Sequence, residues 1–394
     1  WAISHVAVSV FLCVFLSWCG GPAVPPARTD DVETSSVFIN TPLSHPRRRD
    51  HFGWYYHHQL TIKGNDNDHT QQLPTMMTRD SARLGSERCL STTTASGRTL
   101  TVAGVLFLAV STCVPTTLGL RPLLVWHGIN DNCQGFAADV IADIKLAVPN
   151  LYVHCIKTSI SPRDDKIESF IVPANIQLRN VCKQLANDTR LHDGFNAFGI
   201  SQGGLLLRAL IQTCPPGPVH NFVTLAAPHQ GVFGIPECGT RIPEFMCKIG
   251  TAIVNQVAYS HFGQPLATPL GYWHDPAREN TYRLRSSFLA LQNNERDYRE
   301  SVKQNFLKLN KLVLVLNRDD EVLTPPATAH FGFFHEGQGQ GVVNFSSTRL
   351  YEEDLIGLKT LVEQHKVRFE IVPGRHTNYD KLWLQNLVRT YFSE

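Results

Sequence analysis

Short, continuous apolar runs recur along the chain from residue 121 onward, and segments with helical spacing separate them. Runs without polar alternation are typical of strands buried on both faces of a sheet. We expect such strands at residues 123–126, 151–156, 194–200, 220–225, 311–316 and 367–372. Helices are expected at residues 136–148, 175–185, 204–211 and 379–392. This alternation predicts an α/β fold with a mostly parallel central sheet and helices on both faces.

The interval 231–310 breaks this alternation. It is rich in aromatic and helix-forming residues and enters between two predicted core strands. Insertions at that edge of an open α/β sheet lie above the carboxyl ends of the strands, where ligands bind. We therefore expect a helical cap that covers the site and binds an acyl chain. A purely structural insertion is the alternative.

The region before residue 119 has a different character. Residues 20–98 are rich in Ser, Thr, Pro, Arg and Asp, and they show no sustained apolar period. We expect residues 1–98 to be disordered or to be a gene-model extension. The apolar run at 100–114 has the length of a signal-peptide core and is too short for a stable membrane span. We therefore assign 99–119 to a signal peptide and 120–394 to one catalytic domain, with an uncleaved anchor as the alternative.

Composition and charge narrow the possible partners. The chain is 43% hydrophobic and 18% charged, with a formal net charge of +2. Such a balance exerts no strong attraction toward nucleic acid or an anionic membrane surface. We expect no nucleic-acid partner.

Cysteines and sequons fit a secreted domain. The predicted mature chain contains an even set of cysteines, at positions 133, 155, 182, 214, 238 and 247. Even counts in secreted domains indicate disulfides, although spacing alone does not give the pairing. Asn187 and Asn344 each begin an N-glycosylation sequon.

The segment Gly199–Gly204 places one serine where a nucleophile would lie. Its sequence, GISQGG, joins the predicted strand 194–200 to the predicted helix 204–211. A Gly-x-Ser-x-Gly turn between a strand and a helix is the nucleophile elbow of α/β-hydrolases, a known pattern. Glycines remove the Cβ atoms that would clash in so tight a turn. Ser201 is therefore the candidate nucleophile.

A serine hydroxyl needs a histidine base and a carboxylate that orients it. In this fold the acid and then the histidine follow the serine, each on a loop after a core strand. His376 follows the last predicted strand, and Asp320 fits best after the strand 311–316. Asp319 is its close rival, and Glu321 is the third candidate.

An oxyanion hole needs two N–H donors aimed at the developing negative charge. Gln202 follows the nucleophile, and Ile129 lies in the loop after the first strand, so these two residues are the candidate donors. His127 is expected to shape that loop, and His229 is expected to line the site. Chemistry of this kind needs no cofactor and no metal.

Five segments from residue 121 onward resemble the palmitoyl-protein thioesterases, in the same order along the chain. They are VWHG at 125–128, GISQGG at 199–204, HQGVFG at 229–234, YWHDP at 272–276 and FGF at 331–333. Residues 231–236 resemble the type 1 enzyme, whereas 286–291 and the Asp319–Asp320 pair resemble type 2. Type 1 has a tandem cysteine pair where Gln134 follows Cys133 here. Cys133 is thus either free or bonded to Cys155.

The resemblance implies an α/β-hydrolase that removes long-chain acyl groups from protein cysteines, and from acyl-CoA, during lysosomal turnover. By position, Ser201, Asp320 and His376 match the family triad, and Ile129 and Gln202 match its oxyanion donors. The family pattern also implies two disulfides, Cys182–Cys214 and Cys238–Cys247. We expect a lysosomal or secreted protein, as a monomer or a weak homo-oligomer. The alternatives are a carboxylester lipase on the same triad and a catalytically silent binding protein.

Overall fold

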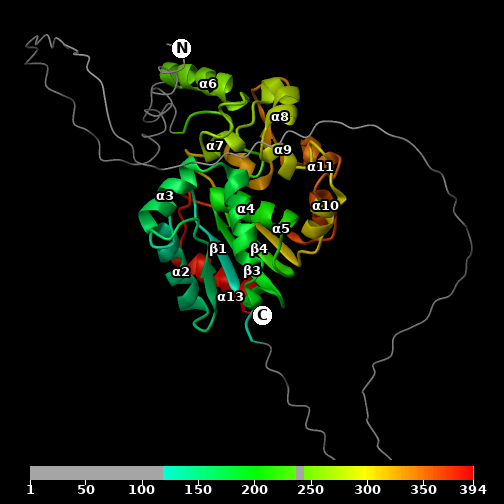
Figure 1. Cartoon of the computed structure of the whole chain (residues 1–394). Helices are drawn as coiled ribbons and strands as arrows, with labels where there is room; N and C mark the ends of the chain where they lie inside the picture. The colour runs from blue at the N-terminus through cyan, green and yellow to red at the C-terminus, as the bar shows by residue number, and fades with distance from the viewer. Residues whose placement is uncertain (1–118, 237–243, 394) are drawn as a thin grey trace, which may run out of the picture. The chain divides into compact units, whose positions relative to one another are not determined.

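A computed structural model of the chain describes residues 119–236 and 244–393. The predicted extension at 1–98 and nearly all of the predicted signal peptide at 99–119 lie outside this range. Six strands form one parallel sheet in the order β2-β1-β3-β4-β5-β8 (Figure 1). Their bounds are Leu123–Trp126 for β1, Val153–Cys155 for β2, Phe195–Ile200 for β3, Val219–Leu225 for β4, Lys311–Asn317 for β5 and Val367–Val372 for β8. All six were predicted from the apolar runs, and an α/β fold is confirmed.

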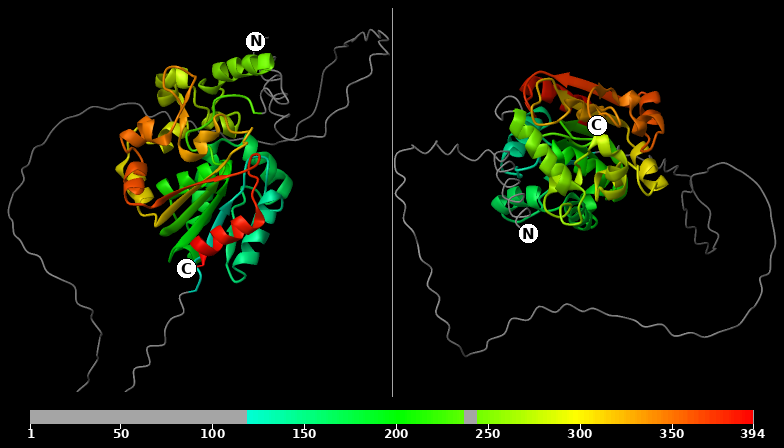
Figure 2. Two further views of the ribbon diagram at one scale, coloured as in Figure 1. Left: turned by 180° about the vertical axis from the view of Figure 1, so that it is seen from behind. Right: turned by 90° about the horizontal axis from the view of Figure 1, so that it is seen from above.

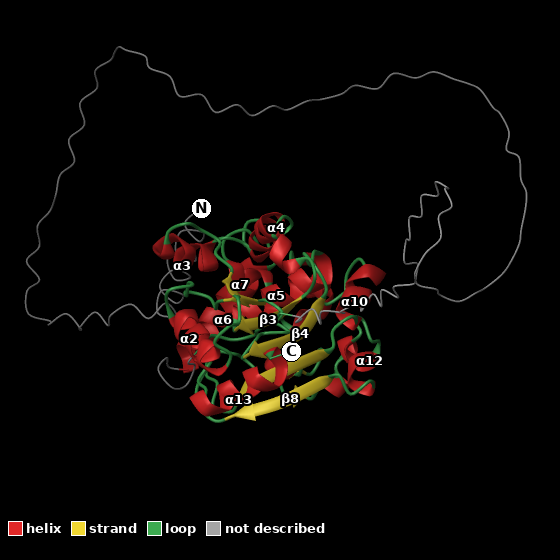
Figure 3. Cartoon of the chain, turned by 90° about the horizontal axis from the view of Figure 1, so that it is seen from below, coloured by secondary structure: helices red, strands yellow, loops and turns green. Residues whose placement is uncertain are grey.

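Helices cover both faces of this sheet. Side chains of successive strand residues point to opposite faces, so Leu124 and Trp126 of β1 join one core, and Leu123 and Val125 join the other. The first core is closed by α4 (Ala174–Leu185), α5 (Gln202–Thr213), α10 (Glu300–Leu307) and α12 (Leu358–Glu363). The second is closed by α2 (Phe136–Ala147) and α13 (Lys381–Phe392), which lie side by side across that face (Figures 2 and 3).

The order of the strands creates one switch point, between β1 and β3. The chain leaves β1 to form β2 on one side, and it then returns to pair β3 with the other side of β1. Connections that depart in opposite directions leave a crevice outside the carboxyl ends of the two strands. The loop after β1 and the elbow after β3 both open into this crevice.

Within its described residues, the predicted insertion contains five α-helices. These are α6 (Glu244–Ala258), α7 (Thr268–Gly271), α8 (Glu279–Arg285), α9 (Leu289–Gln292) and α10. The first four lie beyond one end of the sheet (Figure 1). The last, α10, packs beside α5 and serves as part of the crossover that leads to β5.

Several elements have no counterpart in the sequence analysis. They are α3 (Pro162–Ile171), α11 (Arg349–Glu352), α12, the hairpin of β6 (Phe333–Phe334) with β7 (Val342–Val343), and short 3-10 turns at Thr189–Leu191, Pro276–Arg278, Pro326–His330 and Phe345–Ser347. The apolar pattern did not predict helix α3, because its buried residues, Asp165 and Ser169, are polar. A helix that turns polar residues inward carries no apolar period to detect.

Two disulfides join the described residues. Cys182 of α4 is bonded to Cys214 at the end of α5, as the family pattern implied. Cys133 is bonded to Cys155, which decides the alternative left open above. The expected Cys238–Cys247 pair lies outside the part of the chain that can be described at side-chain level. Among the described helices, none combines the length and the apolarity that a membrane crossing requires.

Candidate active site

Ser201 lies in a strained turn between β3 and α5. Its φ of 51° and ψ of −125° put a non-glycine residue at positive φ. Such a conformation costs on the order of 1–3 kcal/mol and persists only when its surroundings enforce it. Part of that enforcement is a hydrogen bond of 2.8 Å from the Ser201 N–H to the carbonyl of Leu225, at the end of β4. The side chain is held at the switch point, and the residue is 6% exposed.

The glycines around Ser201 are required by close backbone contacts. A Cβ on Gly203 would overlap the carbonyl oxygens of Trp126 and His127 in the loop after β1. A Cβ on Gly199 would overlap the backbone of Gly204, where α5 begins. The motif therefore reflects how tightly β1, β3 and α5 converge, as the elbow interpretation predicted.

His376 and Asp320 meet Ser201 at the same end of the sheet. The Nε2 atom of His376 lies 2.9 Å from Ser201 Oγ, and its Nδ1 lies 2.7 Å from Asp320 Oδ2. Asp320 follows β5 and His376 follows β8, so three loops deliver the three side chains. The second carboxylate oxygen of Asp320 accepts N–H bonds of 2.9 Å from Val322 and from Leu323. The Asp320 side chain is 1% exposed, so its carboxylate is buried. The two N–H bonds fix its orientation.

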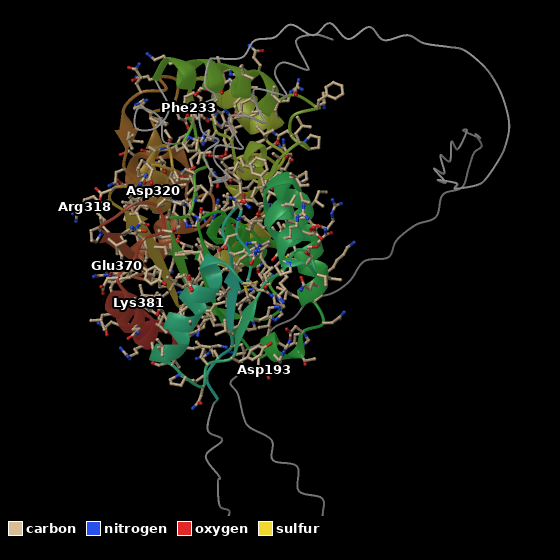
Figure 4. The ribbon with its side chains drawn as sticks, turned by 90° about the vertical axis from the view of Figure 1, so that its left-hand side faces the viewer. Asp193, Phe233, Arg318, Asp320, Glu370 and Lys381 are labelled. Atoms are coloured by element: carbon tan, nitrogen blue, oxygen red, sulfur yellow. A yellow bond between two sulfur atoms is a disulfide. The ribbon has the colours of Figure 1, made fainter. Side chains whose placement is uncertain are left out.

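The two neighbouring carboxylates make different contacts. Asp319 is exposed, and its Oδ2 accepts the N–H of Gly374 at 3.0 Å. Glu321 pairs with Arg375 at 2.5 Å and accepts the His376 N–H at 3.4 Å. Both hold the backbone of the histidine loop, whereas only Asp320, of these three, reaches the imidazole ring. Figure 4 shows Asp320 between Arg318 and, higher in the view, Phe233.

The two candidate oxyanion donors lie in segments that meet at Ser201. Gln202 is the first residue of α5, so its N–H has no partner within the helix. The loop after β1 packs directly against the elbow, because a Cβ on Gly128 would lie 3.3 Å from Ser201 Cβ. Ile129 follows Gly128 in that loop. Both residues therefore lie in segments beside the nucleophile, and their role as oxyanion donors stays a prediction.

Sequence reasoning missed the residues that hold these two donors. The Gln202 side chain donates from Nε2 to the Ser169 carbonyl at 2.8 Å and accepts the Tyr272 hydroxyl at 3.0 Å. The N–H of Asn130, next to Ile129, donates to Ser169 Oγ at 2.8 Å. No motif marks Ser169, which lies on the undetected helix α3.

The expectation that His229 lines the site is wrong. His229 is fully buried, with Nε2 3.1 Å from Thr224 Oγ1 and its ring stacked on Phe331 at 4.5 Å. Burial and the nearby Arg208 guanidinium lower the pKa of His229 well below 6.5. It is a neutral core histidine.

His274 of the YWHDP segment is also buried, but its surroundings are acidic. Its Nε2 lies 2.9 Å from Glu279 Oε1, and its Nδ1 lies 2.7 Å from the Gln230 carbonyl. Burial acts to lower the pKa of His274, but pairing with Glu279 outweighs that effect and raises the pKa. The two histidines therefore favour opposite charge states.

Within the residues that the structure describes, no group of three or more His, Cys, Asp or Glu side chains is arranged to hold a metal ion.

The two sequon residues, Asn187 and Asn344, are both exposed and hence open to modification.

Comparison with known proteins gives a consistent assignment. The family model described as palmitoyl protein thioesterase matches residues 122–376. The chain is 36% identical to palmitoyl-protein thioesterase 1 of Caenorhabditis elegans, over 69% of this chain and 91% of that protein. It is 32% identical to the lysosomal thioesterase PPT2 homolog of Drosophila melanogaster, over 68% of this chain and 90% of that protein. Among solved structures, a Paleococcus ferrophilus monoacylglycerol lipase is similar at 13% identity, with 69% of this chain and 96% of that chain covered and a TM-score of 0.37. The length of the family match and the two relatives together show that this chain belongs to the palmitoyl-protein thioesterase family.

Proposed function

We propose that this protein is a serine hydrolase that removes long-chain fatty acyl groups, palmitoyl among them, from protein cysteines. The observation that carries the proposal is the continuous contact from Ser201 Oγ through the His376 ring to Asp320, at 2.9 Å and 2.7 Å. The three residues lie outside the carboxyl ends of β3, β5 and β8, in the arrangement that a nucleophile, a base and an orienting acid require. Family membership supports the thioester as substrate.

In the proposed reaction, Ser201 Oγ attacks the thioester carbonyl while His376 Nε2 accepts the hydroxyl proton. The carbonyl oxygen becomes an oxyanion that faces the N–H groups of Gln202 and Ile129. When the C–S bond breaks, His376 returns the proton to the departing thiolate, and an acyl-serine remains. His376 then takes a proton from water, and the water oxygen attacks the acyl carbonyl. As the acyl C–O bond to Ser201 breaks, His376 returns that proton to Ser201 Oγ and the fatty acid leaves. Asp320 keeps the imidazole oriented throughout.

The segment after β4 is the proposed cover for the acyl chain. The Phe233 N–H donates to the Thr324 carbonyl at 2.8 Å, which ties this segment to the loop that carries Asp320. The Phe233 ring packs against Trp273 and Phe334, at centroid distances of 5.5 Å and 6.0 Å. Aromatic side chains beside the acid loop support an apolar substrate, whether the thiol is a protein cysteine or coenzyme A.

The test compares a palmitoyl thioester with a matched palmitoyl oxyester. We expect the wild-type protein to prefer the thioester. Ser201→Ala should lose several orders of magnitude in kcat, because only binding and oxyanion stabilisation remain. Labelling by a fluorophosphonate, abolished in Ser201→Ala, checks that the serine is reactive. An oxyester preference would instead support a carboxylester lipase, and folded protein that neither labels nor hydrolyses would support a binding role.

We further propose that the protein works in the lysosome after passage through the secretory pathway. The relatives named lysosomal thioesterases and the exposed sequons at Asn187 and Asn344 support this location. The expressed protein should shift in mass on treatment with an endoglycosidase and sediment with a lysosomal marker. Unglycosylated protein in the cytosolic fraction would contradict the proposal.

A further inference from the structure

We infer that helix α3 sets the geometry of the oxyanion hole through two buried side chains, Asp165 and Ser169, which act as positioning residues. The inference rests on the proposed roles of Ile129 and Gln202. The two residues are four apart on one helix, so they lie on the same face. Each is 1% exposed, and each contacts the loop after β1. None of the sequence motifs includes this helix.

Ser169 contacts both halves of the hole. Its hydroxyl donates to the Lys166 carbonyl at 2.7 Å, which leaves an oxygen lone pair to accept the Asn130 N–H at 2.8 Å. That bond fixes the peptide plane next to Ile129. The Ser169 carbonyl accepts the Gln202 side chain at 2.8 Å. One residue therefore links the loop after β1 to the first residue of α5.

Asp165 lies one helical turn before Ser169 and contacts the same loop after β1. Its Oδ2 lies 3.4 Å from His127 Nε2, and the other nitrogen of that ring lies 2.9 Å from the Gly128 carbonyl. Its Oδ1 accepts from the backbone N–H and the hydroxyl of Thr158, at 2.7 Å and 2.8 Å. Burial acts to raise the pKa of Asp165, but the His127 ring and the Thr158 donors outweigh it and lower the pKa. The carboxylate is thus kept charged beneath the loop.

The end of α3 is fixed as well. The Gln177 side chain of α4 donates to the Val172 carbonyl at 2.7 Å and to the Thr268 hydroxyl of α7 at 2.9 Å. The Thr268 hydroxyl itself donates to the Val172 carbonyl at 2.5 Å. Anchored in this way, α3 can hold the donors against movement, which is what electrostatic preorganisation requires.

The contacts also explain why the helix turns polar residues inward. A buried hydroxyl or carboxylate is unfavourable unless its hydrogen bonds are made. The side-chain partners of Asp165 and Ser169 include the N–H and hydroxyl of Thr158 and the N–H of Asn130 in the loop after β1. An apolar face would pack as well but would leave those groups without partners.

The test measures kcat of the purified Ser169→Ala variant, with the concentration of active enzyme determined by active-site titration. Removal of one oxyanion donor costs about 10²–10³ in kcat, and a donor that is displaced but present costs less. We expect kcat to fall roughly tenfold to a hundredfold with KM within about twofold, because the donors act mainly on the transition state. Asp165→Asn keeps an oxygen for Thr158 but loses the charge beside His127, and its kcat should fall in the same way.

Two ligands separate positioning from a general structural effect. A long-chain trifluoromethyl ketone forms a tetrahedral adduct whose oxyanion enters the hole, so its Ki should rise by the factor by which kcat/KM falls. A thioether of the same chain has no carbonyl oxygen, so its Kd should stay within about twofold of wild type. Asp164→Asn is the matched control, because it makes the same change at an exposed position on α3. Equal weakening of both ligands, or wild-type kcat in Ser169→Ala, would overturn the inference.

A p-nitrophenyl ester should be run beside the thioester, because the hole acts on either acyl group. If the wild-type protein hydrolyses only the ester, the proposed thioesterase function fails while the positioning role of α3 is still tested. If both substrates respond to Ser169→Ala as expected, both proposals stand.

Discussion

Replacing Asp320 with asparagine should disable His376 by reversing the positions of its protons. Two N–H groups, from Val322 and Leu323, donate to Asp320 Oδ1, so an asparagine must keep its oxygen there. Its NH₂ group must then take the place of Oδ2, 2.7 Å from His376 Nδ1. An NH₂ group donates, so Nδ1 becomes the acceptor and the ring proton moves to Nε2. Nε2 then faces Ser201 with a proton and has no lone pair to accept another.

The size of the effect follows from this tautomer argument. Reversal of the tautomer in a serine triad lowers kcat on the order of 10⁴-fold. At about 1.4 kcal/mol for each factor of ten, the loss of transition-state stabilisation is about 5 kcal/mol. Asp319→Asn is the matched control. Asp319 is exposed and accepts one backbone N–H, from Gly374, which an asparagine oxygen can also accept. We expect its kcat to stay within roughly threefold of wild type.

The assay is steady-state hydrolysis of a palmitoyl thioester by both variants, with circular dichroism to confirm folding. Fluorophosphonate labelling rates provide a second reading, because labelling also needs His376 as a base. The reasoning is refuted if Asp320→Asn retains more than a tenth of wild-type kcat, or if Asp319→Asn loses more than Asp320→Asn.

Three further predictions concern stability. Gly203→Ala would overlap two backbone carbonyl oxygens of the loop after β1, so its free energy of unfolding in urea should fall by about 3 kcal/mol; wild-type stability would mean that the elbow is looser than described. Because the pKa of His274 is raised, this residue stabilises the folded state below pH 6.5, and the stabilisation is lost as the pH rises. Because the pKa of His229 is lowered, its contribution is favourable above pH 6.5 and is lost as the pH falls. His274→Gln should thus cost more unfolding free energy at pH 5 than at pH 8, and His229→Gln the reverse; pH trends of the same sign in both variants would contradict the assignment. Replacing Cys182 and Cys214 by serine removes a disulfide between residues 32 positions apart. The free energy of unfolding should fall by about 3–4 kcal/mol, and an unchanged urea midpoint would show that the disulfide does not stabilise the fold.

The sheet was predictable because it is covered on both faces. The central strands β1, β3, β4 and β5 bury mostly consecutive residues. β3 is an unbroken run of buried positions, and no polar alternation obscures it. Helix α3 was not predictable by the same means. Its inward-facing residues, Asp165 and Ser169, are polar because they contact polar groups of a loop more than 30 residues away in sequence. A long-range partner of that kind leaves no local period.

The candidate site was predictable where chain order constrains it. The elbow glycines, the position of His376 after the last strand and the spacing around Asp320 all follow from how a parallel sheet presents its loops. His229 was misassigned because its position shortly after the predicted strand 220–225 also fits a site loop. Its ring stacks on Phe331, and Arg208 donates to its backbone carbonyl, and both residues come from distant segments. Only the assembled core decides that a histidine in such a motif is inaccessible.

The distance along the chain between nucleophile and base has a consequence for biosynthesis. Ser201 and His376 are 175 residues apart, and His376 is positioned only after β8 pairs with β5. As the ribosome releases the chain, β1 through β4 and the elbow emerge long before the histidine loop. Until then Ser201 has no histidine base and cannot act as the proposed nucleophile. With the proposed triad, the nascent protein therefore stays inactive by topology and gains hydrolase activity only when its sheet is complete.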